Sequence, residues 1–301
     1  MNHSNGRRKA LKSIAITTSG IGLGLTALNC KEKSKNEAVN LEIDKKILKG
    51  NINHSACYWC YETMPLNDFA KSAKELGLKG IDLLKPEEWE TAEKYGLKCA
   101  VATDTFANIQ EGFNDRANHS ELQKKYKVLI EKASAQGIKN VIVFSGNKRE
   151  LSEEEGLVNC AEGLAPLVKQ AEEQNVVLIM ELLNSKIDHK DYQCDHTQWG
   201  VKLCELIASD NFKLLYDIYH MQIMEGDVIR TIKDYHSYIA HYHTGGVPGR
   251  HEINDSQELN YPAIMKAILE TGYEGYVAQE FIPTYDNKMV ALKEGVHICD
   301  V

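Results

Sequence analysis

The sequence lacks an excess of positive charge, the feature that most favours binding to nucleic acid backbones. Its 301 residues include 35 lysines and arginines against 43 aspartates and glutamates, for a formal net charge of −8. The first 29 residues contain four basic side chains and no acidic ones, so the rest of the chain is more acidic than the whole. We therefore expect a small-molecule partner and no nucleic acid partner.

The sequence also lacks an apolar run long enough to cross a membrane. The best candidate, "SIAITTSGIGLGLTALNC" (13–30), has an apolar part of about 15 residues, whereas a transmembrane helix needs about 20. It follows "GRRKALK", which contains the pair Arg7 and Arg8. This pattern is typical of a twin-arginine export signal, so we expect residues 1–30 to form a signal peptide. An ordinary surface helix is the alternative.

Cys30 ends this segment at the position of a lipoprotein attachment cysteine, although Asn29 is larger than the small residue that usually precedes one. Residues 31–50 are charged and aperiodic, which is typical of a flexible linker. We expect an exported protein that is periplasmic or membrane-anchored as a lipoprotein through Cys30. The sequence leaves both the lipid anchor and the oligomeric state open.

The sequence has no internal repeats apart from one alternating pattern. From residue 51 onward, short β-rich runs alternate with amphipathic segments. The runs are "HSACYW" (54), "GIDLL" (80), "KCAVATD" (98), "NVIVFSG" (140), "VVLIMELLN" (176), "FKLLYDIYH" (212), "IAHYHTG" (239) and "GYVAQEF" (275). Eight βα units in about 250 residues predict an α/β fold, a (β/α)8 TIM barrel over residues 51–301. A doubly wound open sheet is the alternative. Helix ends are expected at Ser152 with Glu155, a capping box, and at Gly137 and Gly272.

The last four strands each end in a potential metal ligand: Glu181, Asp217, His243 and Glu280. Active sites of TIM barrels lie at the C-terminal ends of the strands, so these side chains are expected to meet. Each taken singly could be a paired or hydrated group, but three clustered carboxylates call for a compensating cation. Oxygen-rich ligands favour Mn²⁺ or Mg²⁺, with Co²⁺ or Zn²⁺ able to substitute.

Five motifs carry a family resemblance: "LIMELLN", "LLYDIYHMQIMEG", "HYHTGGVPGRHEIN", "ELNY" and "VAQEF". With them the chain resembles the hydroxypyruvate isomerase group of the xylose-isomerase-like TIM barrels over most of residues 54–285. The resemblance implies one divalent metal held by the four strand-end residues, with Glu181 and Glu280 also acting as the acid/base pair. It further implies that His220 and Arg250 contact the substrate. The alternatives are that His220 orients Asp217 and that Arg250 is a solvated loop residue.

The expected reaction follows from these residue types. A cation that chelates a carbonyl oxygen and its neighbouring hydroxyl acidifies the adjacent C–H, and two glutamates can move the proton through an enediolate. For hydroxypyruvate the product is tartronate semialdehyde. His243 stands where typical hydroxypyruvate isomerases carry glutamine, so a ketose 3-epimerase or other sugar isomerase stays open. An exported, non-catalytic sugar-binding protein is the alternative outside isomerisation, and the acidic chain argues against a metal-dependent abasic-site nuclease.

The sequence has eight cysteines, and seven remain if Cys30 is set aside. Because seven is an odd number, at least one of them cannot form a disulfide within the chain. "CYWC" (57–60) has the spacing of a redox motif, but we expect it on the first strand instead of at a helix start. Its aromatic residues Tyr58 and Trp59, with Tyr61 after them, are expected to line the pocket.

Overall fold

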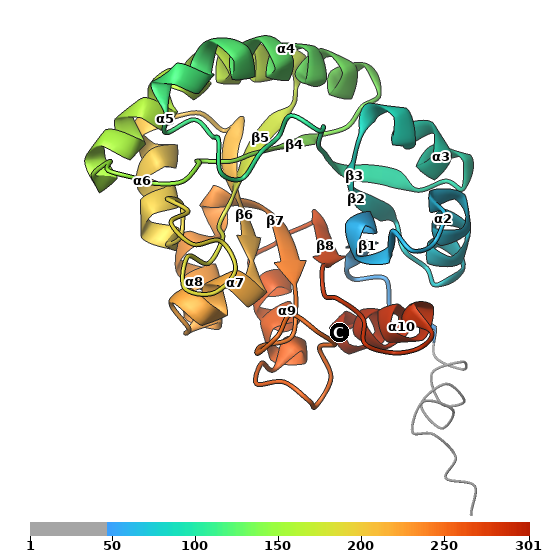
Figure 1. The fold of residues 1–301 in the computed structure, drawn as a ribbon. Coiled ribbons are helices and arrows are strands. Elements are labelled where there is room, and N and C mark those ends of the chain that lie inside the picture. The colour runs from blue at the N-terminus through green and yellow to red at the C-terminus, as the bar shows by residue number, and fades with distance from the viewer. Residues whose placement is uncertain (1–46) are drawn as a thin grey trace, which may run out of the picture.

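Eight parallel strands form the interior of residues 47–301, the part of the chain that this computed structural model describes (Figure 1). The strands are β1 (Asn53–Ala56), β2 (Gly80–Leu84), β3 (Lys98–Ala102), β4 (Asn140–Val143), β5 (Val177–Glu181), β6 (Phe212–Asp217), β7 (Ile239–Thr244) and β8 (Tyr276–Gln279). From β2 to β8 each strand pairs with its neighbour in the chain, and β8 pairs with β1. An isolated bridge between Cys57 and Asp82 links β1 to β2. The sheet is thus nearly closed, so the predicted TIM barrel is confirmed and the doubly wound alternative is wrong.

Helices surround the ring of strands and follow one another around it in chain order (Figure 1). The α-helices are α2 (Leu66–Glu75), α3 (Trp89–Lys94), α4 (His119–Ala135), α5 (Glu153–Gln174), α6 (Thr197–Ile207), α7 (Ile218–Met224), α8 (Val228–Tyr235), α9 (Tyr261–Glu270) and α10 (Lys288–Cys299). The described part of the chain also has four short 3-10 helices: η1 (Tyr58–Tyr61), η2 (Pro86–Glu88), η3 (Arg116–Asn118) and η4 (His236–Tyr238). The predicted signal peptide with Cys30, and residues 31–46 of the predicted linker, lie outside the described residues.

The strands are apolar along their length because both of their faces are covered. In β6, Leu214, Leu215 and Tyr216 are all fully buried, although successive side chains point to opposite faces of a strand. A parallel strand covered by helices on one face and by the barrel interior on the other shows this pattern. The apolar run in the sequence of β6 is therefore explained by burial on both faces.

The strand register brings the predicted site residues to one rim of the barrel. Asp217 on β6 is paired with His243 on β7, and His243 is paired with Ala278 on β8. Because all strands run in the same direction, their C-terminal ends lie at the same end of the barrel. The four strand-end residues are thereby placed on neighbouring strands at a single mouth.

The "CYWC" segment differs from its prediction. Only Cys57 makes a strand-like bridge, and Tyr58–Tyr61 form the 3-10 helix η1, which follows β1. All seven cysteines of the described chain are free and buried. No helix within residues 47–301 combines the length and the apolar character that spanning a bilayer would require.

Candidate metal centre

The four predicted ligands converge at the mouth of the barrel. Glu181 and Asp217 are the last residues of β5 and β6, His243 lies next to the end of β7, and Glu280 directly follows β8. One ligand atom from each side chain lies within 4.8 Å of the others. All four side chains are buried. The structure therefore brings together every residue predicted to hold the cation.

His243 faces two of the carboxylates with one ring nitrogen. Its Nδ1 lies 2.7 Å from Glu280 Oε2 and 3.5 Å from Glu181 Oε1. Glu181 Oε1 is buried and has no hydrogen-bond partner among the described residues. An imidazole nitrogen and three carboxylates, one of them with an oxygen left without a donor, form a set that fits a hard divalent cation.

The charges at this site are poorly balanced by protein groups alone. Burial raises the pKa of Asp217 to about 8, with Glu280 and Glu181 adding to the rise and Arg250 and His243 opposing it. Burial also raises the pKa of Glu181. Burial acts against ionisation of Glu280 too, yet His243 and Arg250 hold its pKa well below the usual range. A divalent cation would relieve the repulsion among the three carboxylates.

Arg250, predicted to contact the substrate, lies directly against the carboxylates. Its Nη2 is 2.6 Å from Glu280 Oε2 and 3.1 Å from Asp217 Oδ2. The guanidinium carbon lies 5.3 Å from the ring centroids of both Trp59 and Tyr219. These contacts contradict the alternative in which Arg250 is a solvated loop residue, and they place a planar cation at the wall of the site.

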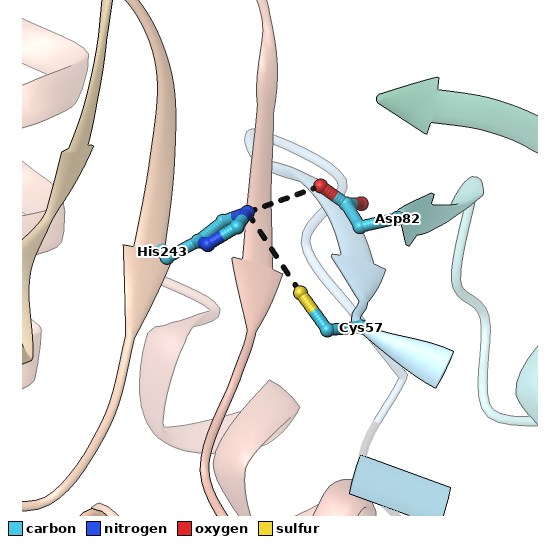
Figure 2. Close-up of side chains that lie close together, drawn as sticks. All are labelled: Cys57, Asp82 and His243. Carbon is cyan, nitrogen blue, oxygen red and sulfur yellow. Dashed lines mark hydrogen bonds and ion pairs between the residues drawn. The ribbon is translucent and has the colours of Figure 1, made fainter. Parts of the chain in front are cut away.

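The other nitrogen of His243 points into the barrel interior. Its Nε2 lies 3.4 Å from Asp82 Oδ2 and 3.7 Å from Cys57 Sγ, as Figure 2 shows. Asp82 Oδ2 also lies 2.5 Å from His241 Nε2. Although burial alone would raise it, the two imidazoles hold the pKa of Asp82 well below its usual range. An anionic carboxylate beside Nε2 favours a proton there. With Glu280 ionised, the 2.7 Å contact between Nδ1 and Glu280 Oε2 requires a second proton on Nδ1. A cation would displace this Nδ1 proton, and the nitrogen would then offer its lone pair as a ligand.

His220, the second predicted substrate residue, lies beside Asp217. Its backbone N–H donates to Asp217 Oδ1 at 3.1 Å, a bond that caps the start of α7. Its Nε2 lies 3.5 Å from Asp217 Oδ2, is fully buried and has no hydrogen-bond partner among the described residues. The opening of "DIYH" as a capped helix explains this placement, because an aspartate at the N-cap accepts from the third residue after it.

Of the aromatic residues expected to line the pocket, Trp59 reaches the site and Tyr61 does not. Trp59 Nε1 donates to Glu280 Oε1 at 2.7 Å, and 38% of the residue remains exposed. Tyr61 is buried in the core, where its ring stacks on Phe69 with centroids 4.9 Å apart. The expectation for Tyr61 was wrong because η1 turns its side chain away from the barrel mouth.

Two residues at the site were missed by the sequence analysis. Asp82 lies within the apolar run "GIDLL" of β2, as Asp217 lies within the apolar run of β6. An acidic residue in a buried strand was therefore a signal that the sequence offered in β2 as well. Asn184 follows Glu181 in "ELLN" and contacts His220 from the loop after β5. An asparagine in a loop carries no distinctive signal, and only its contacts reveal a role.

Comparison with known proteins agrees with this architecture. Residues 70–297 match the xylose isomerase-like TIM barrel family. A putative hydroxypyruvate isomerase from Xenopus laevis is 30% identical over 76% of this chain and 89% of its own length. The hydroxypyruvate isomerase of Escherichia coli K12 is 25% identical over 71% of this chain and 86% of its own length.

Among solved structures, an AP endonuclease of family 2 from Brucella melitensis superimposes with a TM-score of 0.72. The match covers 80% of this chain and 97% of that one at 20% identity, a level at which the likeness shows a shared fold alone. The resemblance inferred from the five motifs is confirmed by the relatives and the family match. The chain belongs to the xylose isomerase-like TIM barrel family.

Proposed function

We propose that the protein is a divalent-metal-dependent isomerase that converts hydroxypyruvate to tartronate semialdehyde. One observation carries the proposal: two buried glutamates, Glu181 and Glu280, approach the same nitrogen of His243 in a site with the ligands for one cation. A protein that only binds sugars has no need for two carboxylates that can exchange protons there. The hydroxypyruvate isomerases among the relatives support the class of reaction.

The side chains have distinct parts in this reaction. A bound Mn²⁺ or Mg²⁺ supplies polarisation of the substrate carbonyl, which acidifies the neighbouring C–H. Burial raises the pKa of Glu181, so this side chain holds a proton more readily than an exposed glutamate and is suited to take one up and release it. Glu280, held ionised by His243 and Arg250, is suited to accept the proton from one carbon, and Glu181 in its protonated form is suited to deliver a proton to the neighbouring carbon. Together the two carboxylates move a proton between neighbouring carbons.

Arg250 favours a substrate that carries a carboxylate. Its guanidinium is held between Trp59 and Tyr219 at the wall of the site. Nε and Nη2 already donate to Glu280 and Asp217, so Nη1 is the nitrogen that can donate to a substrate carboxylate. Hydroxypyruvate has such a group and a neutral ketose has none. A ketose 3-epimerase is the second candidate, and it is favoured by His243, which stands where typical hydroxypyruvate isomerases carry glutamine.

A substrate panel with the full chain in Mn²⁺ or Mg²⁺ tests the proposal. We expect turnover of hydroxypyruvate to exceed that of neutral ketoses, and we expect solvent deuterium in the product when the reaction runs in D₂O. Preferred turnover of ketoses would select the epimerase. Failure to turn over any hydroxy-carbonyl compound would leave a binding protein, and full activity in a Glu181→Gln, Glu280→Gln double variant would exclude the acid/base pair.

A further inference from the structure

Asn184 lies in the loop after β5, three residues beyond Glu181, and is fully buried. Its side-chain Oδ1 accepts hydrogen bonds from the backbone N–H groups of Ile187 at 3.0 Å and Asp188 at 2.9 Å. A backbone N–H can only donate, so the amide atom that faces these two groups is the oxygen. The orientation of the Asn184 amide is thereby determined by the backbone.

The amide nitrogen of Asn184 points the other way, towards two acceptors. Its Nδ2 lies 2.7 Å from Asp188 Oδ2 and 2.6 Å from His220 Nδ1. Asp188 Oδ2 also accepts from the hydroxyl of Tyr219 at 2.8 Å, which holds the carboxylate in place. An amide NH₂ group only donates, so His220 Nδ1 must be the acceptor and carries no proton.

The single ring proton of His220 therefore lies on Nε2. This atom lies 3.5 Å from Oδ2 of Asp217, one of the strand-end residues at the barrel mouth, and it has no hydrogen-bond partner within residues 47–301. A buried donor without a partner is costly unless a ligand satisfies it. The carbonyl and hydroxyl oxygens of a hydroxy-carbonyl compound are acceptors of the kind that would satisfy this N–H.

We propose that Asn184 is a positioning residue that holds His220 in the neutral tautomer with its proton on Nε2, so that His220 donates a hydrogen bond to a substrate oxygen. With the opposite tautomer, the Nε2 lone pair would face both Asp217 and the substrate oxygen, and the interaction would be repulsive. The tautomer follows from the hydrogen bonds alone, whereas the identity of the accepting molecule rests on the proposed function.

Nitrogen NMR of the full chain, labelled with ¹⁵N in its histidines and loaded with Mg²⁺, tests the tautomer directly. Long-range ¹H–¹⁵N spectra distinguish protonated from unprotonated ring nitrogens, and the His220→Gln variant identifies the signals of His220. We expect the proton on Nε2 in the wild-type protein. A wild-type proton on Nδ1 would overturn the proposal whether or not any variant folds.

Asn184→Asp is the decisive variant, because it keeps an oxygen for the two backbone N–H groups and replaces the donor to His220 with an acceptor. We expect the His220 proton to move to Nδ1, and kcat/KM for hydroxypyruvate to fall about 10- to 100-fold, the scale on which such supporting contacts act. Asp188→Asn is the matched control: it changes the charge of the same loop but leaves the amide donor, so the proton should remain on Nε2.

The possible results separate the two proposals. An unchanged tautomer in Asn184→Asp would contradict the role of Asn184. A changed tautomer with unchanged kcat/KM would contradict the donated hydrogen bond. If the wild-type protein turns over no hydroxypyruvate but the tautomer changes in Asn184→Asp, the proposed function fails and the positioning of His220 by Asn184 stands.

Discussion

At the scale of single residues, the three carboxylates of the site differ in what surrounds them. Glu280 accepts from Trp59 and contacts Arg250 and His243, whereas one oxygen of Glu181 has no donor within residues 47–301. Asp217 caps α7 and lies between His220 and Arg250. The environments of the two glutamates fit proton exchange, and that of Asp217 fits a fixed ligand.

The roles of these carboxylates predict separate effects of their removal. Glu181→Gln and Glu280→Gln each keep an oxygen ligand but lose the base, so kcat should fall by ~100-fold or more at saturating metal. Asp217→Asn should first weaken Mn²⁺ affinity. Steady-state kinetics and calorimetric Mn²⁺ titration measure the two effects. Equal losses of metal affinity in all three variants would contradict the division of roles.

The contact of Asp82 with His243 predicts that a residue inside the barrel affects metal affinity. Asp82→Ala removes the carboxylate beside Nε2, so the Nδ1 lone pair is no longer favoured, and Mn²⁺ affinity should fall about 10- to 100-fold. Calorimetric titration measures this loss. Cys57→Ala is the control, because it alters the other neighbour of Nε2 without removing a charge, and it should bind Mn²⁺ nearly as the wild type does. Equal affinity in the Asp82 variant would show that the carboxylate does not orient the ring.

At the scale of elements, helix α5 begins with the predicted capping box. Ser152 Oγ accepts from the backbone N–H of Glu155 at 3.2 Å, and Glu155 Oε2 accepts from the backbone N–H of Ser152 at 2.9 Å. The two bonds satisfy donors that the first turn of a helix would otherwise leave free. Helix α5 is the longest helix of the described chain, so its start should matter for stability.

Ser152→Ala should destabilise the protein by about 1 kcal/mol, the usual cost of losing an N-cap. For a domain of this size the loss corresponds to a fall in Tm of about 2–4 °C, measured by thermal denaturation. Ser120→Ala, an exposed position in the first turn of α4, serves as the control and should change Tm much less. A change in Tm no larger than that of the control would show that the capping box adds nothing measurable.

At the scale of the whole molecule, we expect the proposed metal centre to couple metal binding to stability. A cation that binds the folded chain and not the unfolded chain raises the free energy of unfolding by about 2.7 kcal/mol at 100 times its Kd. The clustered carboxylates, separated along the sequence, have no such arrangement when the chain is unfolded.

Chelation should therefore lower Tm by about 5–10 °C and abolish activity, and Mn²⁺ or Mg²⁺ should restore both. Differential scanning calorimetry with and without metal checks this result. His243→Gln should retain the metal-dependent shift, because an amide oxygen can replace the imidazole, whereas Asp217→Ala should lose it. A shift of the same size in Asp217→Ala would place the cation elsewhere.

Cellular localisation is also a property of the whole molecule, and we propose that residues 1–30 act as a twin-arginine signal. Replacing Arg7 and Arg8 with lysine should leave the protein in the cytoplasm, because the arginine pair is the feature that the export machinery recognises. Cys30→Ala should release the protein from membranes if the cysteine carries a lipid. Cell fractionation measures both results, and unchanged fractions in both variants would exclude export.

The sequence by itself determined the barrel and the four converging ligands. Eight strands could be predicted because the alternation of β-rich and amphipathic segments is a local pattern, which can be recognised without knowledge of the tertiary contacts. Glu181, Asp217, His243 and Glu280 could be predicted to meet because parallel strands end at one rim, so their position in the sequence implies their position in space.

Only the tertiary structure decided which atoms of these side chains face one another. Trp59 and Glu280 are 221 positions apart, and Asn184 reaches His220 from another loop. Neither contact follows from a periodic pattern, because side-chain orientation depends on packing from several elements at once. Tyr61 lies in the core because residues 58–61 form η1 and not the extended strand expected of "CYWC". Packing of its ring on Phe69 is a tertiary contact that local strand propensity does not predict.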